Sequence, residues 1–219
     1  MSIRIIAWGC LVVSLALSGG CGNSSPATEN KYVETPEAIY TGLRGQRCAV
    51  MVWADWRTRT EYNQIQLDTA RLLTSKLQEQ FKSSDKDKKS EALGTHFTLP
   101  ASVVRYQREH PEIYTIPVTE VAPRLNVSRL IYIELEDFSA QSAESIMILK
   151  GFAKATLRIV EVADGKAKAV FEEANITAHF PPDAPEGVMP SEKVTVRAIY
   201  EGTLDLLTDK IQARLRESN

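Results

Sequence analysis

Residues 130–138 read Leu-Ile-Tyr-Ile-Glu-Leu-Glu-Asp-Phe, an alternating pattern that predicts a β-strand. Side chains alternate between the two faces of a strand, so Ile131, Ile133 and Leu135 share one face. Glu134 and Glu136 share the opposite face. This alternation is typical of a sheet that has one covered face and one face at least partly in water.

Two further strands are predicted after this one. Residues 147–162 form a longer run, and Ala163-Asp164-Gly165-Lys166 is typical of a hairpin turn. The alternation of the returning strand assigns its residues to two faces. One face is expected to hold Val170, Ala174, Ile176, Ala178 and Phe180. The other is expected to hold Phe171, Glu173, Asn175, Thr177 and His179.

A strand and a helix are predicted before this meander. Residues 47–54 form a mostly apolar run of strand length, and residues 55–60 are interpreted as a polar loop. The apolar residues over 62–81 recur at helical spacing and predict an amphipathic helix. Its apolar face comprises Tyr62, Ile65, Ala70, Leu73, Leu77 and Phe81. The lysine-rich run 82–89 is interpreted as a solvated surface loop.

Three more helices complete the pattern. Short helices are expected over 103–109 and 117–125, limited by Pro111 and Pro123, because proline cannot continue the helical ladder. Ser191 is the expected N-cap of a long helix that reaches about residue 216. The buried stripe of that helix comprises Ile199, Leu204, Leu207, Ile211 and Leu215.

The predicted fold is α+β, an α/β sandwich in which a small mixed sheet has helices packed mainly on one face. The predicted order is β-α-(short α, short α)-β-β-β-α. A hydrophobic share of 43% and a charged share of 25% are typical of a folded soluble chain. The formal net charge of −2 gives no electrostatic case for nucleic acid as a partner.

The first 20 residues have the features of a bacterial lipoprotein signal peptide. Arg4 precedes an apolar run over 5–17 that is shorter than the roughly 20 residues a spanning helix needs. The run leads into Leu17-Ser18-Gly19-Gly20-Cys21, which makes Cys21 the predicted site of cleavage and acylation, palmitate included. An ordinary secretory signal that leaves Cys21 as a thiol is the alternative.

The rest of the chain is divided into a flexible tether over 21–44 and a single globular domain over 45–219. Gly22, in the place where Asp favours inner-membrane retention, indicates an outer-membrane anchor facing the periplasm. Cys48 lies in an apolar run and is interpreted as a buried strand cysteine. If Cys21 carries no lipid, a disulfide between Cys21 and Cys48 is the alternative.

This order of elements behind a lipoprotein signal resembles the envelope lipoproteins related to the curli-secretion protein CsgG and the penicillin-binding-protein activator LpoB. Their globular domain is similar to the N-terminal domain of TolB. The resemblance rests on residues 48–54, 62–81 and 125–133 and on the turn 163–166. The family often has Gly-Ala-Asp where this chain has Asn126-Val127-Ser128. The resemblance implies the fold and a non-enzymatic adaptor role, and it assigns no functional residue.

The residues that most often carry chemistry form no catalytic pattern. His96, His110 and His179 lack metal-ligand spacing, so they are interpreted as surface or capping residues, and no metal or cofactor is expected. Glu134 and Glu136, with Glu172 on a neighbouring strand, are interpreted as a solvent face that pairs with lysines such as Lys154. A hydrolase that uses these carboxylates is the weaker interpretation. Cys48 shows no neighbouring base.

Trp56, Arg57 and Arg59 are the candidate partner contact, because an aromatic residue and two arginines follow a strand end. The alternative is a tryptophan that folds back over the helix end. We therefore expect a lipid-anchored, non-enzymatic envelope lipoprotein that serves as an interaction or assembly module for an envelope protein partner. A ligand- or lipid-handling accessory lipoprotein is the alternative.

Overall fold

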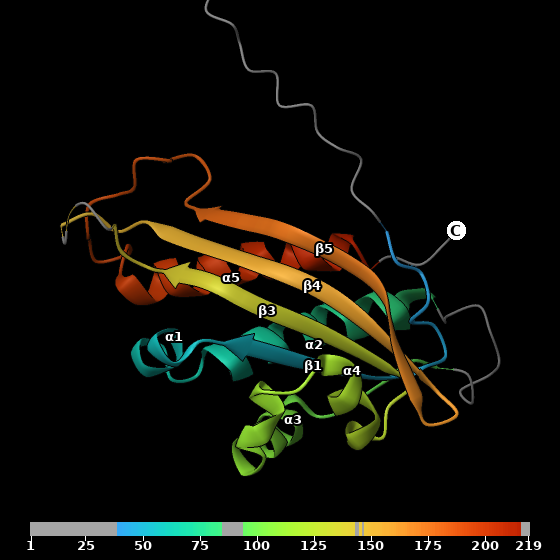
Figure 1. The fold of residues 1–219 in the computed structure, drawn as a ribbon. Helices are drawn as coiled ribbons and strands as arrows, with labels where there is room; N and C mark the ends of the chain where they lie inside the picture. Colours follow the sequence, from blue (N-terminus) through green and yellow to red (C-terminus); the bar gives the residue numbers. More distant parts are fainter. Residues whose placement is uncertain (1–38, 85–93, 143–144, 146, 216–219) are drawn as a thin grey trace, which may run out of the picture. The chain divides into compact units, whose positions relative to one another are not determined.

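The computed structural model describes residues 39–84, 94–142, 145 and 147–215, and the fold is given for these (Figure 1). Its centre is a mixed sheet of five strands in the order β2-β1-β3-β4-β5. The strands are β1 Arg47–Ala54, β2 His96–Phe97, β3 Arg129–Ser139, β4 Gly151–Ala163 and β5 Lys166–Phe180. β1 runs parallel to β2 and β3, whereas β3, β4 and β5 form an antiparallel meander.

Helices cover both faces of this sheet to different extents. The two long helices, α2 Ile65–Ser84 and α5 Val196–Ala213, pack side by side on one face (Figure 1). A layer of short helices covers part of the other face, near β1 and β3. It consists of α3 Pro100–Glu109, η3 Pro111–Tyr114, α4 Val118–Val121 and η4 Ala122–Leu125. The remaining helix, α1 Trp56–Glu61, follows the end of β1.

The larger core lies between the sheet and the two long helices. Ile131, Ile133 and Leu135 of β3 are fully buried there, as their alternation predicted. The predicted apolar faces of α2 and α5 are confirmed from Ile65 to Phe81 and from Ile199 to Leu215. A smaller core joins the opposite face of the sheet to the short helices. Its buried members are Ala49, Met51, Val103, Ile113, Val121, Ala122, Val127, Leu130 and Val160.

The α+β class and the predicted order of strands and helices are therefore confirmed, and the differences concern single elements. Residues 55–60 are not a polar loop, because five of them lie in α1. Asp55 initiates that helix, since its Oδ1 accepts a hydrogen bond from the Thr58 backbone N–H at 2.7 Å. β2 was not expected, because two residues are too few for a periodic pattern.

The N-terminal residues of β4 and α5 also differ from expectation. β4 begins at Gly151, four residues after the start of the predicted run. Thr195, not Ser191, caps α5, because its Oγ1 accepts the Ala198 backbone N–H at 3.1 Å. The Ser191 hydroxyl instead accepts the Val194 backbone N–H at 3.1 Å in the preceding turn.

The faces of β5 were predicted wrongly in its first half. The pairing of β4 with β5 shifts twice, between Ala155 and Leu157 and between Ile159 and Val160. Each shift inserts an extra residue into β5 and moves the following side chains to the other face. Phe171 therefore packs against the larger core and Val170 is exposed, the reverse of the expected arrangement.

Candidate functional site

The candidate contact residues lie at one end of the domain, on α1. Trp56 is the first residue of this helix and is 73% exposed, so it does not fold back over the helix end. Arg57 beside it is exposed. The hydrogen bond from the Thr58 backbone N–H lowers the pKa of Asp55, so the carboxylate that caps α1 is charged at neutral pH. α1 thus presents an apolar ring and a cation side by side on a capped helix.

Arg59 takes a different direction from Trp56 and Arg57. Its guanidinium lies over the Tyr114 ring of η3, 5.0 Å from the ring centroid, and its Nε donates to the Asp55 carbonyl at 3.3 Å. The structure therefore brings Trp56 and Arg57 together on the surface and directs Arg59 toward the layer of short helices.

A groove of about 1160 Å³ lies between α2 and α5 and reaches the end of α1 at Glu61 and Tyr62. Tyr62 and Tyr200 line it as a stacked pair, with ring centroids 5.7 Å apart. The Tyr200 hydroxyl donates to Asp68 at 2.9 Å, and burial together with this carboxylate raises the pKa of Tyr200. The lining combines aromatic and aliphatic side chains with acidic and basic ones.

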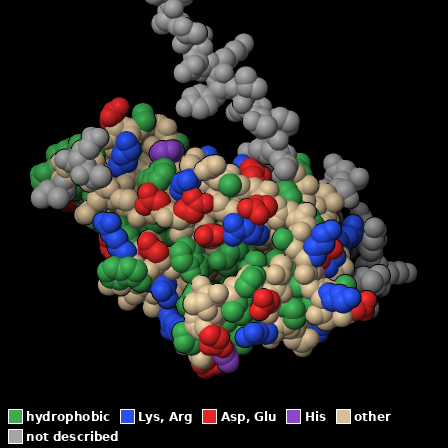
Figure 2. Space-filling view, in the orientation of Figure 1, with side chains coloured by type: hydrophobic (Ala, Val, Ile, Leu, Met, Phe, Trp, Pro, Cys, Tyr) green, Lys and Arg blue, Asp and Glu red, His purple; other side chains and the backbone are tan. Residues whose placement is uncertain are grey.

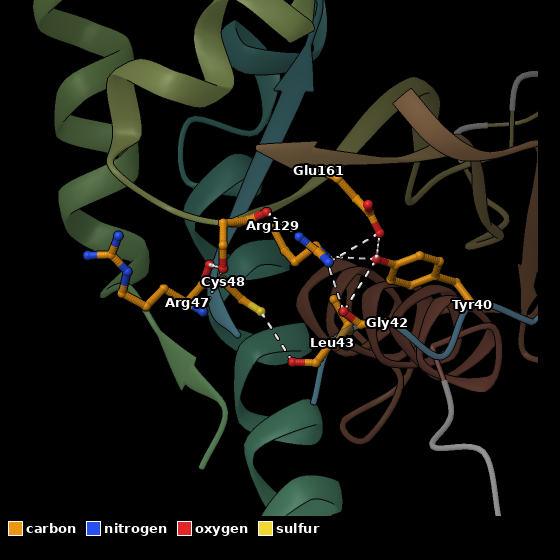
Figure 3. Close-up of polar contacts among 8 residues, drawn as sticks. Tyr40, Gly42, Leu43, Arg47, Cys48, Arg129 and Glu161 are labelled. Carbon is orange, nitrogen blue, oxygen red and sulfur yellow. Dashed lines mark hydrogen bonds and ion pairs between the residues drawn. The ribbon is translucent and has the colours of Figure 1, made fainter. Parts of the chain in front are cut away.

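The chain enters the domain at the end opposite α1. The Tyr40 hydroxyl donates to Glu161 Oε1 at 2.9 Å and accepts from Arg129 Nε at 3.0 Å. Figure 3 shows these three side chains pointing toward one another. Arg129 is the first residue of β3 and pairs with Cys48 at the start of β1, whereas Trp56 follows the last residue of β1. The eight-residue length of β1, about 25 Å, separates the two ends.

The acidic residues of β3 form ion pairs on the open face of the sheet. Arg158 contacts Glu134 at 2.6 Å and Glu172 at 3.3 Å. Lys154 contacts Glu136 at 2.8 Å, the partner that the sequence predicted, and lowers the pKa of that carboxyl. Figure 2 shows acidic and basic side chains interspersed on this face. Glu134 and Glu172 meet at a cation between them, an arrangement that differs from the paired carboxylates of a hydrolase.

The histidines lie far apart on the domain. His96 is exposed on β2, and His179 is exposed on β5 against the Phe152 ring. His110 follows the last residue of α3, the helix-ending position that the sequence predicted. Among the described residues, no group of three or more His, Cys, Asp or Glu side chains is placed to hold a metal ion.

Of the two cysteines discussed from the sequence, Cys48 is fully buried and unpaired in β1. Burial raises the pKa of its thiol to about 12, which is typical of an unreactive structural cysteine. Cys21 lies outside the described residues. Within the part of the chain that the structure describes, no helix is both long enough and apolar enough to span a bilayer.

A small pocket of about 160 Å³ lies between the sheet and the short helices. Its sheet side is formed by Met51, Trp53, Tyr132 and Glu134, so Trp53 lines this pocket and is only partly buried in the core. Cavities that hold small organic ligands start at about 300 Å³. The pocket is therefore small for a lipid or a similar apolar ligand.

The chain has remote structural similarity to three solved proteins. No protein-family model matches it, and no curated protein matches its sequence. The lipoprotein GNA1162 from Neisseria meningitidis is 10% identical, with a TM-score of 0.40 over 76% of this chain and 95% of that protein. The hypothetical protein CT253 from Chlamydia trachomatis is 10% identical, with a TM-score of 0.36 over 77% and 96%. A dodecameric PelC variant from Paraburkholderia phytofirmans is 10% identical, with a TM-score of 0.35 over 82% and 96%.

Proposed function

We propose that this chain is a lipid-anchored, non-enzymatic accessory protein of the cell envelope, and that its domain docks onto an envelope protein through α1. The observation that carries this proposal is the 73% exposed side chain of Trp56, at the end of the domain opposite Tyr40. A large exposed aromatic side chain loses contact with water when a partner covers it, which makes tryptophan a frequent centre of protein interfaces.

The position of Tyr40 gives the docking surface a direction. A lipid on Cys21 would hold the chain at the membrane, and residues 22–39 would join that lipid to the domain. Eighteen residues span at most about 60 Å when fully extended. Because the chain enters beside Tyr40, α1 at the other end would be presented away from the anchoring membrane. A partner in the periplasm or in the opposite membrane would then meet Trp56 and Arg57 first.

A photo-crosslinking amino acid at position 56 tests the docking surface in the lipidated full-length protein. We expect illumination of cells to yield one adduct of defined mass from position 56. Leu99 is the matched control, because it is also 73% exposed but lies at the start of α3. Equal adducts from positions 56 and 99, or none from position 56, would contradict docking through α1.

The anchor is tested separately by metabolic labelling with a clickable palmitate. We expect label on the wild-type protein and none on the Cys21→Ala variant. Cys48→Ala serves as the control for acylation at the other cysteine of the mature chain, and it should keep the label. Label that survives Cys21→Ala would overturn the anchor without affecting the docking surface.

Two observations favour docking over the other candidate activities. The carboxylates proposed for a hydrolase are held by Arg158 and Lys154 on an open face. A ligand- or lipid-handling role, the alternative from the sequence, would need a larger space beneath the sheet than the pocket of about 160 Å³ there.

A further inference from the structure

A second pocket, of about 340 Å³, lies beyond the C-terminal end of β1, where helices from the two faces of the sheet approach each other. Its polar lining comes from α1, the start of α2, α3 and η3. The residues that matter are Arg59, Asn63, Gln66, Gln107, Arg108 and Tyr114. Trp56 and Arg57 do not line it, so it is a different site from the proposed docking surface.

Gln107 supplies the observation that points to a ligand. The residue is only 1% exposed, and its Nε2 donates to the Val52 carbonyl at 2.9 Å. This bond fixes the orientation of the amide, because the reverse orientation would place Oε1 against another carbonyl oxygen. The Gln107 Oε1 is buried and has no hydrogen-bond partner among the described residues. An acceptor buried without a donor is costly, so the pocket favours an occupant that provides an N–H or O–H group.

The charge of the pocket sets the other requirement. Two arginines line it, and no acidic side chain is among its lining residues in the described chain. Neither Arg59 nor Arg108 forms a salt bridge within the described residues. The nearby Asp55 carboxylate is engaged in capping α1. Because the guanidinium group binds carboxylate and phosphate in matching geometry, the pocket favours an anion.

We propose that this pocket binds a carboxylate with an adjacent N–H donor, the arrangement found in an N-acylated amino acid and at the free C-terminus of a peptide. The carboxylate pairs with Arg59 and Arg108, and the neighbouring N–H donates to Gln107 Oε1. A sulfate ion, which carries no proton near neutral pH, satisfies only the first condition, since it brings only acceptors toward the unpartnered oxygen. The proposal does not depend on docking through Trp56.

The probe is N-acetylalanine, titrated into the purified full-length protein and followed by calorimetry. N-acetylalaninamide carries the same N–H without the carboxylate, and sulfate carries negative charge without any N–H or O–H donor. We expect N-acetylalanine to bind at least about tenfold more tightly than either, as the loss of one charged hydrogen bond predicts. An acetylated tripeptide that ends in alanine distinguishes a polypeptide end, which it would mimic better, from a small metabolite.

Arg108→Gln should weaken binding of N-acetylalanine about tenfold or more. Arg105→Gln is the matched control, because Arg105 is exposed on the same helix but does not line the pocket. Gln107→Met should reduce the preference for the acid over sulfate. A melting curve of each variant confirms that it is folded. The proposal is overturned if the acid and its amide bind equally well, or if the two arginine variants weaken binding equally. It is also overturned if N-acetylalanine does not saturate the protein by about 10 mM.

Discussion

Tyr40 and Trp56 lie at opposite ends of the sheet. Tyr40 Oη accepts a hydrogen bond from Arg129, the first residue of β3, and Trp56 follows the last residue of β1, a strand parallel to β3. The first relationship fixes where the chain enters the domain, and the second fixes where its most exposed aromatic residue lies. The proposed function depends on this separation of Tyr40 from Trp56. The contacts at each end of the sheet can be tested separately.

Tyr40→Phe should lower the free energy of unfolding by about 1–2 kcal/mol, because it removes the hydroxyl bonded to Glu161 and Arg129. Urea denaturation measures the loss. Tyr106→Phe is the control, since the Tyr106 hydroxyl forms no hydrogen bond in the described part of the chain. A loss of the same size in both variants would show that the Tyr40 hydroxyl contributes nothing specific.

Glu173→Gln should destabilise the domain more than Glu172→Gln, although the two residues are neighbours in β5. Glu173 Oε1 lies 2.6 Å from Arg214 Nε in a largely buried pair, so the neutral amide removes the negative charge from a buried contact. We expect a loss of about 2–3 kcal/mol. Glu172 is more than half exposed beside Arg158, and its replacement should cost about 0.5 kcal/mol. Similar losses in both variants would contradict the buried pair.

Stability should fall as the pH rises above 9. Burial raises the pKa of the Cys48 thiol from 9.0 to about 12, so the unfolded chain releases this proton first and ionisation favours unfolding. Burial raises the pKa of Tyr40, Tyr62 and Tyr132 from 10.0 to about 12, which adds to the effect above pH 10. The expected contribution of each group is at most about 1.4 kcal/mol per pH unit.

The Cys48→Ala variant isolates the thiol in that pH dependence. Between pH 9 and 10 the unfolded thiol ionises before the tyrosines do, so the variant should lose less stability across this interval than the wild type. Guanidinium denaturation at closely spaced pH values measures both slopes. Parallel curves for the two proteins would mean that Cys48 ionises alike in the folded and unfolded states.

The sequence predicted those parts of the fold in which a local pattern coincides with burial. Ile131, Ile133 and Leu135 alternate along a regular strand, and the stripe from Ile65 to Phe81 follows the helical period, so both were assigned correctly. The faces of β5 depend on where β4 forces an extra residue, and the sequence of β5 alone does not contain that information. For this reason, Val170 and Phe171 were each predicted on the wrong face of the sheet.

The two candidate sites differ in how far they could be identified from the sequence, because one depends on local residues and the other on long-range packing. Trp56 was identified because it follows a strand end among polar residues, and the Asp55 cap that makes α1 a helix was a local signal that could have been recognised. Gln107 gave no signal, because its importance comes from the Val52 carbonyl, 55 residues away in the chain. A buried glutamine in an otherwise amphipathic helix is visible only after β1 and α3 are packed together.

Capture of partners by the lipidated full-length protein from envelope extracts is the most direct test of docking through α1. The comparison is between the wild type, Trp56→Ala and Leu99→Ala, two truncations of equally exposed side chains whose stabilities should stay within about 0.5 kcal/mol of the wild type. We expect a partner that the Leu99→Ala variant captures in full and whose capture by Trp56→Ala falls about tenfold or more. Equal recovery by Trp56→Ala and the wild type would contradict docking through α1.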